Sequence, residues 1–206
     1  MGYYFFSWGI KTEEIKAVFG CKDKTIIDKV KASDTFDNYN ENDHSGISVA
    51  TALKDIITGD NYNEEAGYQY GYAVICICAA LGSELPYSQE IKMWHETDFI
   101  NKYLSESFGI QNMVIEEEFF ADNTNPFQIP KIEDWPMIGL VKHAGLLLLK
   151  ERLKNINITD EEIEELENSN DEDGEEKGFA FQHIKGIIEN IDYCIENNLD
   201  LINFSH

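Results

Sequence analysis

A ten-residue apolar run, Tyr72 to Leu81, constrains the fold more than any other feature of the sequence. It reads Y-A-V-I-C-I-C-A-A-L and has about half of the roughly 20 residues that a membrane-spanning helix needs. It is also longer than most strands, and it is followed by Gly82, a residue that favours helix termination. We therefore expect a buried central helix over 68–81, packed inside a folded core.

The rest of the chain supplies enough apolar surface to close such a core, but its charge is one-sided. Of the 206 residues, 43% are hydrophobic and 12% are aromatic, which predicts a single folded domain over residues 1–206. The chain has 16 Lys and Arg against 39 Asp and Glu, a formal net charge of −23. That field repels nucleic-acid phosphates and anionic membrane surfaces, so neither is expected as a partner. A basic protein surface is attracted instead.

The cysteines and the first residues of the sequence favour a cytoplasmic location. Four scattered cysteines in a chain of this size are typical of reduced thiols, and Cys76 and Cys78 lie inside the apolar run. The N-terminal residues lack the basic head and apolar stretch of a secretory signal. No further ligand follows Cys76 and Cys78 at zinc-site spacing, so no metal site is expected there.

Strands are expected near both ends of the chain. Tyr3 to Trp8 and Leu199 to Phe204 have strong strand propensity, and Lys92 to Glu96 is a third, short candidate. The Asp- and Asn-rich stretch Ser33 to Gly46 favours a loop. Apolar stripes and capping signals predict helices over 23–31, 48–57, 68–81, 98–107, 145–153 and 179–197. The expected fold class is α+β, with a small, mainly antiparallel sheet formed by N- and C-terminal strands and packed against several helices.

The negative charge is concentrated between Asp160 and Glu176, where eleven of seventeen residues are acidic and none is Lys or Arg. Thr159 and Glu162 have the spacing of a capping box, which predicts a helix that begins at Asp160. Because blocks of like charge repel one another, Asn168 to Glu176 is expected to be a mobile acidic loop.

A search for catalytic patterns finds no constellation. None of the five histidines lies in a recognisable nucleophile motif, and no glycine-rich phosphate loop or calcium-loop spacing is present. Paired carboxylates are too abundant in this sequence for any one pair to stand out. We expect no catalytic residue, no metal and no cofactor, and an enzyme based on scattered carboxylates stays the third alternative.

Several motifs together resemble a family of small bacterial proteins known only as a domain of unknown function. They span most of the chain: E-x5-G-C-K-D over 14–23, Y-G-Y-A over 70–73, L-G-S-E-L-P over 81–86, D-W-P-M-I-G over 134–139 and L-D-L-I-N-F over 199–204. The resemblance implies a bacterial, cytoplasmic α+β domain. It assigns no catalytic residue.

These observations favour a non-enzymatic binding protein. The leading hypothesis is an immunity protein that neutralises a cognate bacterial toxin, with a nuclease-like, basic active site that the acidic protein covers. The alternative is a general adaptor or regulatory protein-interaction module. The expected partner-binding residues are acids of the charged run and three residues of the first long loop: Glu161, Glu164, Glu165, Asp171, Glu172, Asp173, Asp37, Tyr39 and Asp43.

Overall fold

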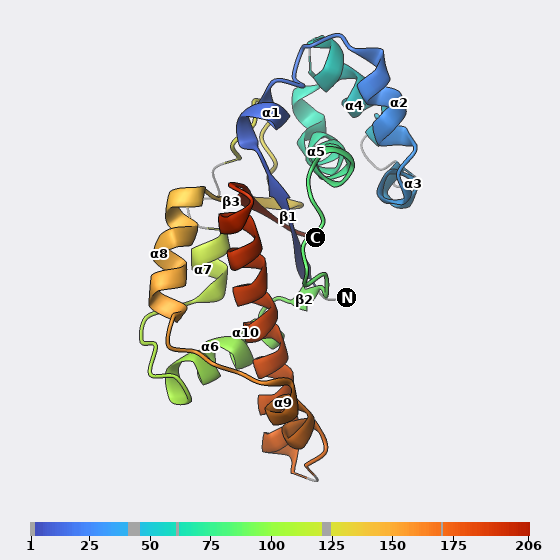
Figure 1. The fold of residues 1–206 in the computed structure, drawn as a ribbon. Coiled ribbons are helices and arrows are strands. Elements are labelled where there is room, and N and C mark those ends of the chain that lie inside the picture. The colour runs from blue at the N-terminus through green and yellow to red at the C-terminus, as the bar shows by residue number, and fades with distance from the viewer. Residues whose placement is uncertain (1–2, 41–45, 61, 121–124, 170) are drawn as a thin grey trace.

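A four-stranded antiparallel sheet divides the molecule into two helical layers (Figure 1). The computed structural model describes residues 3–40, 46–60, 62–120, 125–169 and 171–206, apart from the side chain of Glu172. Helices α2 to α5 gather at one end of the molecule and α6 to α10 at the other, with the sheet between them. The predicted α+β class is confirmed.

The sheet has the strand order β2-β1-β4-β3, so the two terminal strands lie side by side at its centre. The strands are β1 (Tyr4–Ile10), β2 (Ile91–Lys92), β3 (Met137–Val141) and β4 (Asp200–Ser205). The register of β1 and β4 runs from Phe5 opposite Ser205 to Ile10 opposite Asp200. The predicted terminal strands are thus confirmed.

The strand that we expected over Lys92 to Glu96 is shorter than the prediction. β2 ends at Lys92 because the chain turns directly after it, and Trp94 adopts a left-handed backbone conformation with φ of 59°. A residue in that conformation does not continue a strand.

The first helical layer contains α1 (Thr12–Lys16), α2 (Lys24–Lys31), α3 (Asp34–Asn40), α4 (Val49–Thr58) and α5 (Gly67–Leu81). A 3-10 turn, η1, covers Glu64–Ala66. The caps agree with the sequence, since the Ser48 side chain accepts from the Thr51 N–H and Gly59 ends α4 in the left-handed conformation. The apolar run forms most of α5 and is buried over residues 73–78, as predicted.

The predicted loop over Ser33 to Gly46 is wrong in its first half, because α3 begins there. Ser33 accepts a hydrogen bond from the Phe36 N–H at 3.3 Å, and the Phe36 ring is buried against the first layer. Packing of that ring outweighs the turn preference of the neighbouring Asp and Asn residues. Residues 41–45 lie outside the described part of the chain.

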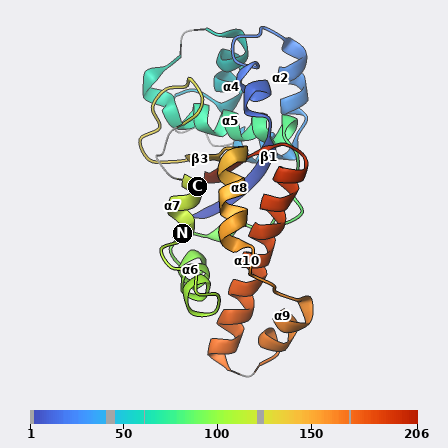
Figure 2. The same cartoon turned by 60° about the vertical axis from the view of Figure 1, so that its left-hand side comes forward.

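The second layer contains α6 (Glu96–Glu106), α7 (Ile115–Phe120), α8 (His143–Leu153), α9 (Asp160–Glu167) and α10 (Glu172–Glu196). Of the helices in the described ranges, none has the length and apolarity needed to cross a bilayer. The long helix α10 begins beside α9, far from the sheet, contacts α6 and α8, and reaches the sheet with its C-terminal part (Figure 2).

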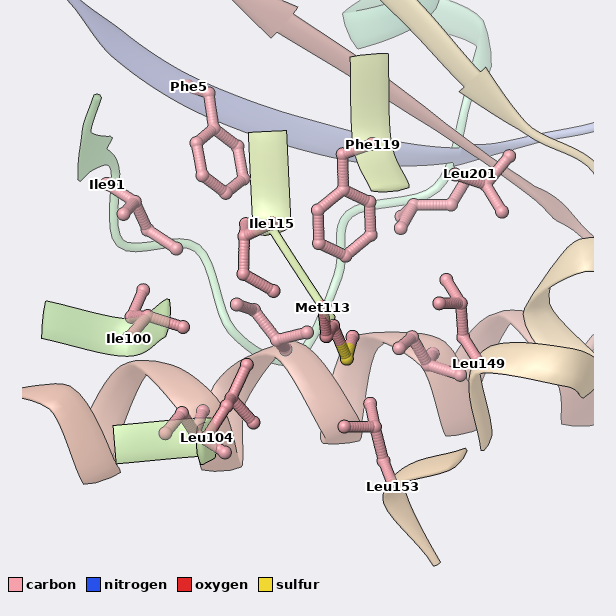
Figure 3. Packing of buried hydrophobic residues seen from close by; sticks show 14 of the residues in the cluster. Phe5, Ile91, Ile100, Leu104, Met113, Ile115, Phe119, Leu149, Leu153 and Leu201 are labelled. Atoms are coloured by element: carbon pink, nitrogen blue, oxygen red, sulfur yellow. The ribbon is translucent and has the colours of Figure 1, made fainter. Parts of the chain in front are cut away.

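Side chains alternate between the two faces of the sheet along each strand, so each helical layer has its own hydrophobic core. Phe5 and Leu201 point from β1 and β4 toward α10, while Leu104 and Leu153 reach the same core from α6 and α8 (Figure 3). Phe204 faces the opposite side and packs with α2 to α5. Because successive side chains of a strand point to opposite faces, both faces of the sheet are covered.

The predicted mobile loop over Asn168 to Glu176 is largely helical, because α10 begins at Glu172. Acids are favourable in a first helical turn, where the helix dipole is positive. Glycines also allow α9 and α10 to approach each other closely. A Cβ on Gly178 would lie 3.0 Å from the Leu166 Cβ, and one on Gly174 would lie 2.0 Å from the Ser169 Oγ.

Candidate functional site

The charged run forms a helical hairpin at one end of the molecule. We call residues 160–176, which comprise α9, the connection and the first turns of α10, the acidic hairpin. It lies at the far end of α10 from α1 to α5 in both orientations (Figures 1 and 2). Its exposed carboxylates are Glu161, Glu162, Glu164, Glu165, Glu167, Asp171, Asp173 and Glu175.

Two other acids attach the hairpin to the body of the protein. Asp160 pairs with Lys185 at 2.5 Å, and Glu176 pairs with Lys102 at 2.7 Å. Glu176 also accepts from the Tyr103 hydroxyl at 3.1 Å. The hydrogen bond from Lys102 lowers the pKa of the Glu176 carboxyl, which keeps it ionised. Among the described residues, no ion pair neutralises any of the eight exposed carboxylates.

Packing holds these like charges on an ordered scaffold. Thr159 caps α9 by accepting from the Glu162 N–H at 3.1 Å, as the capping box predicted. Ile163 is buried, and Leu166 packs against the same core. Burial of such side chains offsets the repulsion between exposed carboxylates, which is weak in high-dielectric solvent.

The structure divides the predicted binding residues into two separate groups. Glu161, Glu164, Glu165, Asp171 and Asp173 are exposed together on the acidic hairpin. Glu172 begins α10, and its side chain lies outside the description.

The second predicted group belongs to the opposite layer. Asp37 is exposed on α3, which packs on α4 and α5 across the sheet from the acidic hairpin (Figure 1). Tyr39 is half-buried, and its hydroxyl lies 2.8 Å from the His206 Nε2 while its ring stacks on Tyr72 at 4.9 Å. Burial, with a smaller contribution from the charge of Glu90, raises the pKa of Tyr39. Asp43 lies outside the described residues.

A cleft that the sequence did not reveal opens beside β1. It has a volume of about 720 Å³ and lies between the strand, α3, the segment 84–91 and α10. We call it the β1 cleft. Its walls carry aromatic rings together with amide, hydroxyl and carboxylate groups: Phe6, Trp8, Asn38, Tyr39, Glu84, Tyr87, Glu90, Asn190 and His206.

One wall of the β1 cleft is fixed by Tyr87. Its backbone N–H donates to the Asn190 Oδ1 at 2.9 Å, and its carbonyl accepts from the Asn190 Nδ2 at 2.8 Å. Its ring lies against Gly186, where a Cβ would come within 2.1 Å of the ring. These contacts fasten the segment 84–91 to α10.

The Tyr87 hydroxyl continues into a buried polar chain. It lies 2.5 Å from the His183 Nδ1, and the His183 Nε2 faces a Glu96 oxygen at 3.6 Å. Burial lowers the pKa of His183 to about 4 and raises that of Tyr87. Both groups are therefore neutral at pH 7. The Tyr87 hydroxyl also donates to the Gln89 Oε1 at 2.9 Å, and it has one proton, so the direction of its hydrogen bond with His183 depends on the histidine tautomer.

The described residues contain no candidate metal-binding site. No group of three His, Cys, Asp or Glu side chains there is placed to hold a metal ion. The four cysteines are free, and burial raises the pKa of Cys76 to about 12, which keeps that thiol protonated.

Sequence reasoning missed the β1 cleft because its parts are distant along the chain. Tyr87 and Asn190 are 103 residues apart, and Tyr39 and His206 are 167 residues apart. No short motif joins them. The L-G-S-E-L-P sequence over 81–86 enters the cleft wall, but its residues gave no chemical signal by themselves.

Comparison with known proteins identifies a family rather than an activity. No curated protein and no solved structure gives a significant match to the chain. The family described as Domain of unknown function (DUF7691) matches residues 1–206, the whole chain. This match confirms the resemblance to a domain of unknown function that the motifs indicated. The protein therefore belongs to the DUF7691 family.

Proposed function

We propose that the protein is a non-enzymatic binding protein whose acidic hairpin docks on a basic surface of another protein. The observation that carries this proposal is the set of eight exposed carboxylates, without a basic partner among the described residues, on an ordered and projecting pair of helices. A net charge of −23 steers a basic protein toward the molecule. The hairpin then supplies the charges that come into contact.

The specific form that we propose is inhibition. An immunity protein that acts by occlusion covers the active site of its toxin, and a nuclease-like site is basic because it binds phosphates. Carboxylates on a narrow hairpin can occupy such a site in place of those phosphates. Charge pairs desolvated at an interface can dominate its binding energy, whereas pairs at the rim mainly set the association rate.

The test compares two variants of equal net charge. The hairpin variant replaces four exposed acids with amides: Glu161→Gln, Glu164→Gln, Glu165→Gln and Asp173→Asn. The matched control replaces four exposed acids elsewhere: Asp28→Asn, Asp34→Asn, Glu106→Gln and Glu117→Gln. Both changes add four units of charge, so they alter long-range attraction similarly and differ in location.

Binding to a co-purified basic partner is measured by titration calorimetry at several salt concentrations. We expect the hairpin variant to bind at least about tenfold more weakly, which corresponds to about 1.4 kcal/mol, and to show a shallower salt dependence. The control should stay within about threefold of wild type. If the partner is a toxin, wild type and control restore growth of cells that express it, and the hairpin variant does not. Equal effects of the two variants would refute docking through the hairpin.

An adaptor function is the second candidate, favoured by a separate exposed aromatic cluster. Trp94 is 54% exposed and Tyr3 is 41% exposed, and Tyr3 stacks on Trp135 at 3.9 Å. Exposed tryptophan and tyrosine side chains are frequent anchors of protein interfaces. Trp94→Ala should abolish binding of a second partner that the hairpin variant still binds. If the protein is an inhibitor with one partner, no second partner is found whose binding depends on Trp94 and not on the hairpin.

A further inference from the structure

The β1 cleft has the volume of a small-molecule site, and the charged side chains in its described lining are acidic. Small-molecule sites commonly measure about 300–1,000 Å³, and this cleft measures about 720 Å³. Its described lining contains the carboxylates of Glu84 and Glu90 and no Lys or Arg. His206 does not reverse this balance, because burial lowers its pKa and leaves the ring uncharged at pH 7.

The edge of β1 adds main-chain groups to the cleft. On one side, β1 bonds to β4 through alternate residues, which include Tyr4 paired with His206. On the other side, Phe5 is paired with Ile91 and Gly9 exchanges two hydrogen bonds with Ser83.

Ser7 lies between these two pairings. By the same alternation its N–H and C=O point away from β4, toward the segment 84–91 that lines the cleft. Within the described residues they form no main-chain hydrogen bond. The Ser7 carbonyl is therefore available to a hydrogen-bond donor in the cleft.

Aromatic rings provide the remaining surface. Phe6 and Trp8 contact each other edge to face at 5.2 Å, and the Tyr39 ring lies 5.2 Å from His206 on the neighbouring wall. Glu90 lines the same cleft as these two rings. Aromatic faces attract cations, and this attraction is stronger where water is partly excluded.

We propose that the β1 cleft binds a small organic cation that carries a guanidinium or primary ammonium group. The cation donates hydrogen bonds to the Ser7 carbonyl and to the carboxylates of Glu84 and Glu90, while its hydrocarbon part packs on Phe6 and Trp8. This site is independent of the acidic hairpin. The wall formed by Tyr87 is held on α10, so the cleft exists before the ligand arrives.

The experiment uses n-butylguanidinium as the probe and n-butylurea as its uncharged isostere. Trp8 lines the cleft, whereas Trp94 and Trp135 do not, and the chain has 3 Trp in all. The indole N–H signals in a ¹H–¹⁵N spectrum of the full chain therefore report the position of binding. We expect saturable movement of the Trp8 signal with the guanidinium and at least tenfold weaker binding of the urea.

Matched double variants separate a site from general attraction to an acidic protein. Glu84→Gln with Glu90→Gln should weaken the guanidinium Kd at least tenfold, whereas Glu161→Gln with Glu164→Gln, which changes net charge equally, should change it less than twofold. Equal weakening by both pairs, non-saturating shifts, or shifts at all three tryptophans would overturn the proposal. Thermal unfolding of each variant confirms that it is folded. Loss of hairpin binding to a protein partner leaves this measurement unaffected, so the two proposals fail separately.

Discussion

The buried histidine on α10 makes stability depend on pH in a way that can be calculated. His183 is 1% exposed, and burial lowers its pKa from 6.5 to about 4. The unfolded chain therefore takes up a proton near pH 6.5, whereas the native protein does so only near pH 4. Stability is complete above pH 6.5, falls as the pH drops toward 4, and changes no further from this group below that value.

The size of the effect follows from the same two values. Each pH unit between them costs about 1.4 kcal/mol, so the whole interval of 2.5 units corresponds to about 3 kcal/mol. The sequence pI of about 4.4 makes the protein poorly soluble near the lower end, so measurements stop at pH 5. From pH 7.5 to pH 5 the expected loss from His183 is about 2 kcal/mol.

The perturbation is His183→Asn, since the Asn side chain has both a hydrogen-bond donor and an acceptor for the Tyr87 hydroxyl near the position of Nδ1 and does not titrate. Urea unfolding is followed by tryptophan fluorescence at constant ionic strength. The free-energy difference between wild type and variant should shrink by about 2 kcal/mol from pH 7.5 to pH 5. The control Asn155→Ala alters an exposed side chain that does not titrate and should show a constant difference. Parallel wild-type and His183→Asn curves would falsify the assignment of a buried, neutral imidazole.

Three further substitutions test packing and hydrogen bonds around the sheet. Gly186→Ala places a Cβ 2.1 Å from the Tyr87 ring and should destabilise by about 2–4 kcal/mol in thermal unfolding. Gly145→Ala is the control: its Cβ meets only one Val141 methyl at 3.2 Å, and alanine favours the helix, so it should cost less than about 1 kcal/mol. Asp200→Asn should cost about 1–3 kcal/mol at pH 7 by urea unfolding. Burial opposes the charge of Asp200, but its three hydrogen-bond donors outweigh burial and lower its pKa, so this contribution persists above its ordinary pKa of 3.8 and disappears on further acidification.

Local physics explains which elements could be predicted. The helix over 68–81 followed from an unbroken apolar run, and the cap at Ser48 followed from side-chain geometry within one turn. These signals need no distant partner. The loops predicted over 33–46 and 168–176 were partly wrong, and there repulsion or turn preference had favoured a loop. There Phe36 and the close contact of Gly178 with α9 supply tertiary packing that a local pattern does not contain.

The sequence by itself determined the acidic character, the helix-rich α+β class with strands at both ends, and the position of the charged run. Each of these depends on composition or on periodicity over a few residues. Only the tertiary structure decided that the run forms two packed helices, that Tyr39 lies away from them, and that a cleft exists beside Ser7. A cleft is formed by residues that approach after the chain has folded, so the distances that define it are absent from the order of residues along the chain.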